Sequence, residues 1–157
     1  MDKVSKYVSM NEATRSQLAL KLGIDNTPNQ EQFKNMQAVA MNIFDKVRLN
    51  FGVPIFISSF FRSLKLNAAT PGSSETSQHV TGEAIDIDAD YFGKVTNCQI
   101  FLFILNNCIF DQLIWEFGDD ESPAWVHVSF SRTKNRMKVL KSVRGKKGGV
   151  TYEKYAA

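Results

Sequence analysis

The two histidines of the chain, His79 and His127, are the residues best suited to bind a metal ion. His79 follows a loop rich in Ser, Thr and Gly and lies seven residues before Asp86, whereas His127 lies within the predicted strand Trp125-Val-His-Val-Ser129. Two neutral imidazoles and one carboxylate suit Zn²⁺ that keeps a fourth position open for water, as in catalytic sites. Spacing alone also leaves open that each histidine is a polar core residue.

A carboxylate is expected beside this site because of the hairpin that contains His127. The segments Gln112–Phe117 and Trp125–Ser131 are predicted to be strands, joined by the acidic turn 118–123. If Glu116 pairs directly with His127, their Cβ atoms lie about 5 Å apart on one face. A general base belongs at such a position, since zinc brings the pKa of its water to about 7 and a carboxylate can accept the proton.

The strand that carries Asp86 is predicted from its alternation. In Ala84-Ile-Asp-Ile-Asp88 the carboxylates share one face and the isoleucines the other. The preceding stretch 70–77 is rich in turn-forming residues and is expected to be a loop. The sequence therefore predicts a strand with an acidic face directly after the loop that leads to His79.

Helices are predicted mainly in the N-terminal third. Ser9-Met-Asn-Glu12 fits a capping box for a helix that ends before Gly23. A longer helix, capped by Thr27, is indicated by apolar residues at three- and four-residue spacing until Gly52. The remaining predicted elements are a strand at 53–58, a brief helix at 64–69 and a buried helix at 96–107.

These elements predict an α+β fold in one domain, residues 1–157. N-terminal helices are expected to pack on a small, mainly antiparallel sheet that carries a mononuclear zinc site. The composition changes near Arg132, and residues 132–157 are expected to form a basic tail or a last strand.

A longer motif surrounds the two histidines. It reads Ser77-x-His79-x-x-Gly82-x-Ala84-x-Asp86 and, far downstream, Trp125-x-His127. This motif resembles the zinc site of the LAS-type peptidases, which include D-Ala-D-Ala carboxypeptidases, phage endolysins and the hedgehog signalling domain. Further similar segments extend the resemblance from Ser9 to Ser131; they are Gly23–Pro28, Arg48–Gly52, Ser58–Ser63, Leu66–Asn67 and Phe110–Ile114.

The resemblance implies a zinc peptidase that cleaves an amide bond in peptidoglycan stem peptides. His79, Asp86 and His127 would be the metal ligands. Arg62 would hold a carboxylate or carbonyl of the substrate, a role that suits the guanidinium group. Ser77 would steady His79 or line the substrate pocket, and Gly82 would allow a turn that a Cβ atom would obstruct.

Two positions depart from the family pattern. Phe60 stands where relatives often have glycine, close to Arg62. Ala124 stands three residues before the last histidine ligand, where some relatives have an acid. Glu116 and Glu121 are therefore the candidates for the catalytic base, and Glu116 is preferred because a strand can fix it.

The composition and charge of the chain limit the classes of partner that it could bind. With 43% hydrophobic and 22% charged residues the chain is typical of a soluble globular protein, and no apolar run is long enough to cross a bilayer. Residues 132–157 hold nine Lys/Arg and one Glu. This basic segment could attract an anionic cell-wall polymer, nucleic acid or anionic lipid, or could simply be solvated. Sparse aromatic residues between the charges argue against single-stranded nucleic acid.

The remaining expectations concern cysteines and location. Cys98 and Cys108 would be about 15 Å apart on a helix and are expected to be reduced, buried and structural. No signal peptide is recognised, so the protein is expected to be cytoplasmic as synthesised and to act on the cell wall after release, as phage or prophage lysis proteins do. A cytoplasmic D-Ala-D-Ala dipeptidase and a non-enzymatic, zinc-stabilised binding module are the alternatives.

Overall fold

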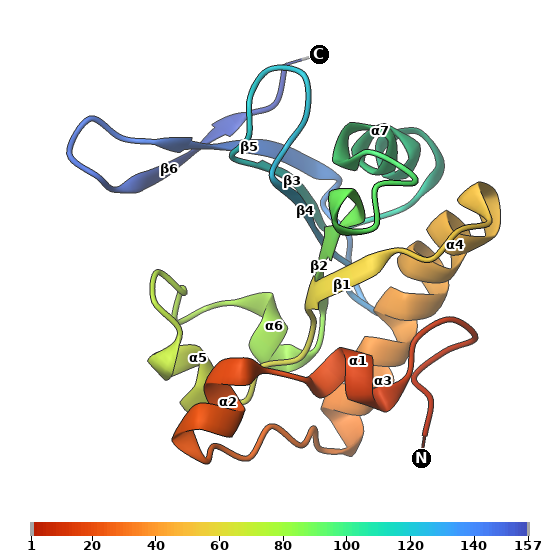
Figure 1. Ribbon diagram of the computed structural model, residues 1–157, viewed down its shortest axis with the longest axis vertical. Helices are drawn as coiled ribbons and strands as arrows, with labels where there is room; N and C mark the ends of the chain where they lie inside the picture. The colour runs from red at the N-terminus through yellow and green to blue at the C-terminus, as the bar shows by residue number, and fades with distance from the viewer. Residues whose placement is uncertain (1, 157) are drawn as a thin grey trace.

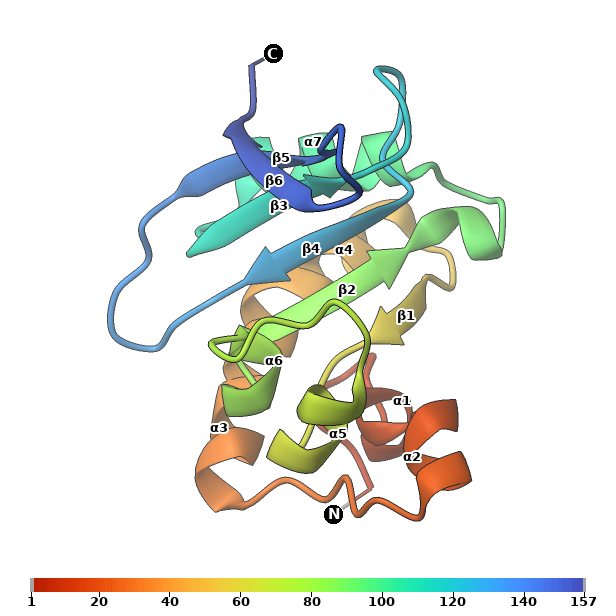
Figure 2. The ribbon, with the colours of Figure 1, turned by 90° about the vertical axis from the view of Figure 1, so that its left-hand side faces the viewer.

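A six-stranded mixed sheet forms the centre of the computed structural model, which describes residues 2–156. The strands are β1 Phe56–Ser59, β2 Ala84–Asp88, β3 Gln112–Glu116, β4 Trp125–Ser129, β5 Lys138–Arg144 and β6 Val150–Lys154. Their order is β1-β2-β4-β3-β5-β6 (Figures 1 and 2). Neighbouring strands are antiparallel except β3 and β5, which are parallel. The predicted α+β class with a mainly antiparallel sheet is confirmed.

The helices lie on two sides of this sheet. They are α1 Met10–Thr14, α2 Gln17–Leu22, α3 Gln30–Val39, the π-helix η1 Ala40–Phe44, α4 Asp45–Phe51, α5 Leu64–Ala69, α6 Gln78–Thr81, the 3₁₀-helix η2 Ala89–Tyr91 and α7 Asn97–Asn107. Figure 1 shows α4 and α7 on one side of the sheet and α5 and α6 on the other. The second side is the one that carries polar side chains.

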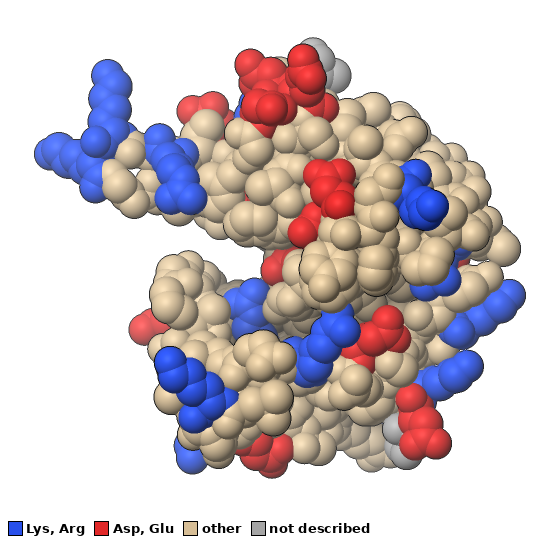
Figure 3. All heavy atoms as spheres, in the orientation of Figure 1, with Lys and Arg blue, Asp and Glu red and all other residues tan. Residues whose placement is uncertain are grey.

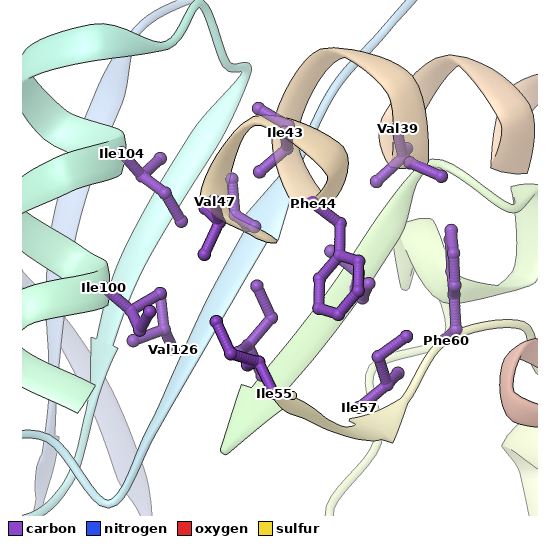
Figure 4. Packing of buried hydrophobic residues seen from close by; sticks show 14 of the residues in the cluster. Val39, Ile43, Phe44, Val47, Ile55, Ile57, Phe60, Ile100, Ile104 and Val126 are labelled. Carbon is purple, nitrogen blue, oxygen red and sulfur yellow. The ribbon is translucent and has the colours of Figure 1, made fainter. Parts of the chain in front are cut away.

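The hydrophobic core fills the space between the sheet and the long helices. Ile85 and Ile87 of β2 are fully buried there, which leaves Asp86 on the opposite face. Figure 4 shows how the helices meet the sheet, with labelled side chains from α3, η1 and α4 (Val39, Ile43, Phe44, Val47), α7 (Ile100, Ile104), β1 and its flanks (Ile55, Ile57, Phe60) and β4 (Val126). Burial of this apolar surface fixes the face of β2 that is left for chemistry.

Two helix starts differ from prediction. The predicted first helix is two helices, because the backbone is extended at Arg15 and the Ser16 side chain caps a new helix by accepting a hydrogen bond from Ala19 N–H. Thr27 does not cap the long helix, since its N–H and hydroxyl both donate to the Asp25 carboxylate. Asn29 is the cap instead. From Gln30 the helix continues to Gly52, with η1 inserted.

The strands also differ in detail. The first strand begins at Phe56, because Pro54 has no N–H for a ladder in the predicted stretch from Val53. In the β3–β4 hairpin Glu116 pairs with Trp125, and Ile114 pairs with His127, so the predicted direct pairing of Glu116 with His127 is wrong. The true register is shifted by two residues, which keeps both side chains on the same face.

The basic C-terminal segment is part of the sheet. Its residues form both β5 and β6, and β5 pairs with β3 from Gln112 to Trp115. Cys98 and Cys108 are free thiols; Cys108 is buried and Cys98 is half-buried. Within residues 2–156, no helix is both long enough and apolar enough to cross a membrane.

Candidate metal centre and its groove

His79, Asp86 and His127 come together on the polar side of the sheet. Asp86 of β2 pairs directly with His127 of β4, so their side chains share one face. Helix α6, which carries His79, ends at Gly82 just before β2 begins and so returns His79 toward Asp86. One donor atom from each of the three residues lies within 4.8 Å of the others.

Asp86 is the centre of this cluster. Its Oδ1 lies 2.8 Å from His127 Nδ1, and its Oδ2 lies 3.2 Å from His79 Nε2. Burial opposes charge on Asp86, but its interactions with His79 and His127 outweigh that effect and lower the pKa of the carboxyl below its usual value. The carboxylate is therefore ionised and available as an anionic ligand.

The buried ring of His79 shows that a cation fits here. Its Nδ1 lies 2.6 Å from the carbonyl oxygen of Phe60, which can only accept, so the proton of the neutral ring is on Nδ1. Nε2 then presents a lone pair toward Asp86 and has no hydrogen-bond partner, although it is buried. Burial lowers the pKa of His79, which disfavours a proton on Nε2. A metal ion would satisfy both electron-rich atoms.

Local structure holds α6 in place. The Ser77 hydroxyl accepts a hydrogen bond from His79 N–H at 3.4 Å, and Ser77 also lines the groove, so the geometry suits both of its expected roles. Gly82 has φ +78°, and a Cβ atom there would lie 2.6 Å from the Gln32 carbonyl oxygen. Only glycine therefore lets α6 approach α3 this closely.

An ion pair between the buried Asp111 and the exposed Arg136 also supports α6. Asp111 accepts hydrogen bonds from Arg136 Nε and Nη2 at 2.8 and 2.7 Å and from Gln78 Nε2 at 3.0 Å. The hydrogen bond to Arg136 is the largest cause that lowers the pKa of Asp111 to about 2. Gln78 immediately precedes His79, so this network connects β3 and the C-terminal segment to the helix of the first histidine.

A groove of about 560 Å³ opens over the cluster. Glu116 lines it, with only 6% of its surface exposed, and burial raises the pKa of its carboxyl against the opposing effect of Ser142. Glu121 is exposed in the turn before β4 and does not line the groove. Of the two candidate bases, the structure thus places only Glu116 beside His127.

Arg62 also lines the groove. Its Nε donates to Ser59 Oγ at 3.1 Å, and its Nη2 lies 3.5 Å from Asp86 Oδ2. These contacts fix the guanidinium group next to the three candidate ligands. Phe60, which departs from the family pattern, is buried and contributes its carbonyl to His79, so its side chain does not fill the groove.

Several groove residues are not predicted from the sequence. They are Phe117 and, from the β5–β6 hairpin, Leu140, Val150 and Tyr152. The hairpin reaches the groove through the parallel pairing of β3 with β5, which no local pattern indicates. Residues 140, 142 and 144 share one face of β5, but the sequence Leu-Lys-Ser-Val-Arg has no polar and apolar alternation that would indicate which face meets the groove.

Two histidines and a carboxylate, from α6, β4 and β2, open to a groove that also holds a buried glutamate, and this donor set could hold one metal ion as hydrolytic metal sites do. The family model described as Peptidase M15 matches residues 6–129, and the chain belongs to this family. The resemblance to zinc D-Ala-D-Ala carboxypeptidase-like peptidases is thereby confirmed. At family level the chain is a metallopeptidase of the peptidoglycan type, and M15 peptidases are typically zinc-dependent. No curated protein in the comparison matches it.

Proposed function

We propose that the protein is a zinc-dependent peptidase that hydrolyses an amide bond in peptidoglycan stem peptides, as a D-Ala-D-Ala carboxypeptidase or an endolysin-type endopeptidase. The observation that carries the proposal is the convergence of His79, Asp86 and His127 at the floor of a groove that also contains Glu116. Membership of the M15 family supports the same chemistry.

Each residue has a role that follows from its position. His79, Asp86 and His127 would hold Zn²⁺, which when bound supplies a Lewis acid that polarises the substrate carbonyl and lowers the pKa of water. Glu116 accepts the proton of the attacking water and gives it to the leaving nitrogen. Arg62 holds a carboxylate or carbonyl of the substrate, and the hydroxyl of Ser77 contributes to the adjoining wall.

The proposal extends to the setting of the reaction. A phage or prophage lysis protein, made in the cytoplasm and acting on the wall after release, would meet an anionic polymer. Nine Lys/Arg against one Glu in residues 132–157 favour attraction to such a polymer. Figure 3 shows Lys and Arg gathered at the free end of the β5–β6 hairpin, next to the hollow in the molecule.

Mass spectrometry of muropeptides tests the proposal. Purified muropeptides are incubated with the zinc-loaded protein and, as a matched control, with the His127→Ala variant. Loss of a defined fragment only with the unsubstituted protein is expected, and the mass lost identifies the bond. Unchanged muropeptides together with stoichiometric zinc would instead favour the non-enzymatic binding module.

A further inference from the structure

The β5–β6 hairpin lies beyond the residues that the family model matches, yet it forms a wall of the groove. Leu140, Val150 and Tyr152 face the same cavity as His127 and Glu116. In Figure 3 the molecule is deeply hollowed between this hairpin and the part that contains α5 and α6. A ligand that occupies the groove over the metal centre therefore has the hairpin beside it.

Phe117 links the β5–β6 hairpin to strand β3, which ends at Glu116. It follows Glu116 directly and has φ 51°, a left-handed conformation that is strained for an aromatic residue. Its N–H donates to the buried hydroxyl of Ser142 in β5 at 2.9 Å, and its ring lies 5.4 Å from that of Trp125. The hairpin thus holds a strained residue so that its ring forms part of the groove wall.

A cation without a carboxylate partner adjoins this ring. Arg144 Cζ lies 4.8 Å from the centre of the Phe117 ring, and Arg144 is exposed opposite Val150 in the hairpin. Among residues 2–156 no ion pair joins Arg144 to an acidic side chain. The facing loop contributes neutral groups to the groove, mainly hydroxyls from residues 70–77. Arg144 does not itself line the groove, but it adjoins Phe117 and Val150, which do, and its guanidinium group is suited to bind a carboxylate with two hydrogen bonds.

We propose that Phe117, Tyr152 and Arg144 form a specificity wall, which binds a carboxylate-bearing part of the substrate away from the cleaved bond. The wall makes the protein selective for acidic peptides over their neutral, amidated forms. The inference rests on the proposed function for its substrate class, an extended acidic peptide. Arg144 belongs to a different wall from Arg62, so the two arginines can bind separate groups of one ligand.

Peptide binding to the zinc-loaded protein tests this wall. The probes are the stem pentapeptide L-Ala-γ-D-Glu-L-Lys-D-Ala-D-Ala and the same peptide with the free carboxylate of D-Glu amidated. Isothermal titration calorimetry is performed in a Glu116→Gln background, so that the peptides stay intact. The acidic peptide is expected to bind about 5-fold more tightly, the upper end of the range for an ion pair at an exposed side chain.

Substitutions in the specificity wall distinguish the contribution of the Arg144 charge to peptide affinity from that of the Tyr152 contact surface. Arg144→Gln should remove the preference and leave the affinity for the amidated peptide within about twofold, while Arg144→Lys should retain part of it. Tyr152→Ala should weaken both peptides equally. Lys34→Gln, which removes one exposed charge on α3, is the matched control and should change neither affinity.

The wall and the proposed function can fail separately. Three outcomes would overturn the specificity wall. They are equal affinity for the two peptides, absence of binding by both, and an acid preference that persists in Arg144→Gln. Absence of hydrolysis of any muropeptide by the unsubstituted protein would overturn the proposed function alone, because an acid preference lost in Arg144→Gln is measured without turnover.

Discussion

Glu116 and His127 are diagonal neighbours on one face of the β3–β4 ladder, two positions apart along the strands. Diagonal positions in an antiparallel pair are about 7–8 Å apart at Cα, within reach of a glutamate side chain. Because both residues lie on paired strands, the sheet limits the distance between the carboxylate and the candidate metal ligand. Their relationship makes Glu116 the residue whose removal should affect turnover without affecting the fold.

Glu116→Gln is expected to lower kcat by roughly 10²- to 10⁴-fold, the usual contribution of a general base, because an amide cannot accept the proton. Stopped assays on muropeptides measure the rate, and zinc content checks the site. Glu121→Gln is the matched control and should retain near-normal rates, since Glu121 is exposed outside the groove. Loss of activity only in Glu121→Gln would identify the turn residue as the base.

The zinc-loaded protein should contain about one metal ion per chain. His79→Ala and His127→Ala should each weaken zinc binding by more than the roughly 10- to 100-fold that follows loss of a residue supporting a ligand. Asp86→Asn should weaken it less, because the amide oxygen can still coordinate. Elemental analysis after dialysis against a weak chelator measures the zinc content per chain of each variant, with Cys98→Ser as a control. Full occupancy in both histidine variants would refute the ligand set.

Local patterns predict the parts of the site that depend on single elements. Alternation in β2 places Asp86 opposite the buried Ile85 and Ile87, and the structure shows this arrangement. The capping box at Ser9 and Glu12 is also present. These features depend on contacts between residues a few positions apart, which the sequence displays directly.

Local patterns do not predict features that depend on competition between two helix caps or on pairing between strands that are distant in the sequence. Ser16 provides a second cap and divides the first helix, although the preceding cap at Ser9 is correct. The β3–β4 register is set by where the turn closes, through Ala124 N–H and the Glu116 carbonyl, and side-chain alternation is identical for a shift of two. The hairpin wall depends on the pairing of β3 with β5, which leaves no local periodicity.

Stability should depend on pH through Asp111. Its pKa is lowered from 3.8 to about 2 in the folded protein, chiefly by the hydrogen bond from Arg136. A lowered carboxyl pKa stabilises the fold above the unfolded value, near pH 4, and this contribution is lost as the pH falls through about 2. Arg136→Gln should therefore cost about 1–2 kcal/mol at pH 7, a value reduced for the exposure of Arg136, and progressively less below pH 4.

Urea unfolding of the Arg136→Gln variant and the unsubstituted protein at pH 7, 4 and 3 measures this difference in the free energy of unfolding. Lys138→Gln serves as the control, because Lys138 is exposed nearby and forms no ion pair within residues 2–156. A deficit in Arg136→Gln that stays constant down to pH 3 would show that the pair with Asp111 is not its source.

The basic hairpin turn should affect activity on whole walls. Lys146→Glu with Lys147→Glu is expected to lower the rate on intact cell walls and to make it less sensitive to salt, because surface attraction is screened within about 10 Å at 0.1 M salt. Hydrolysis of small soluble peptides should be unchanged. Lys141 is not included, since it pairs with Asp120. Equal loss on both substrates would indicate a structural role for the turn.

Gly82 should connect backbone conformation to metal affinity. In Gly82→Ala the new Cβ would lie 2.6 Å from the Gln32 carbonyl oxygen at φ +78°, so α6 must move away from α3 and take His79 with it. We expect a loss of about 1–3 kcal/mol in the free energy of unfolding and weaker zinc binding. Gly93→Ala is the matched control, because Gly93 has φ +69° but open space around its Cβ position. That variant should lose only about 1 kcal/mol and bind zinc normally. Equal zinc affinities in the two variants would show that His79 does not depend on the close approach of α6 to α3.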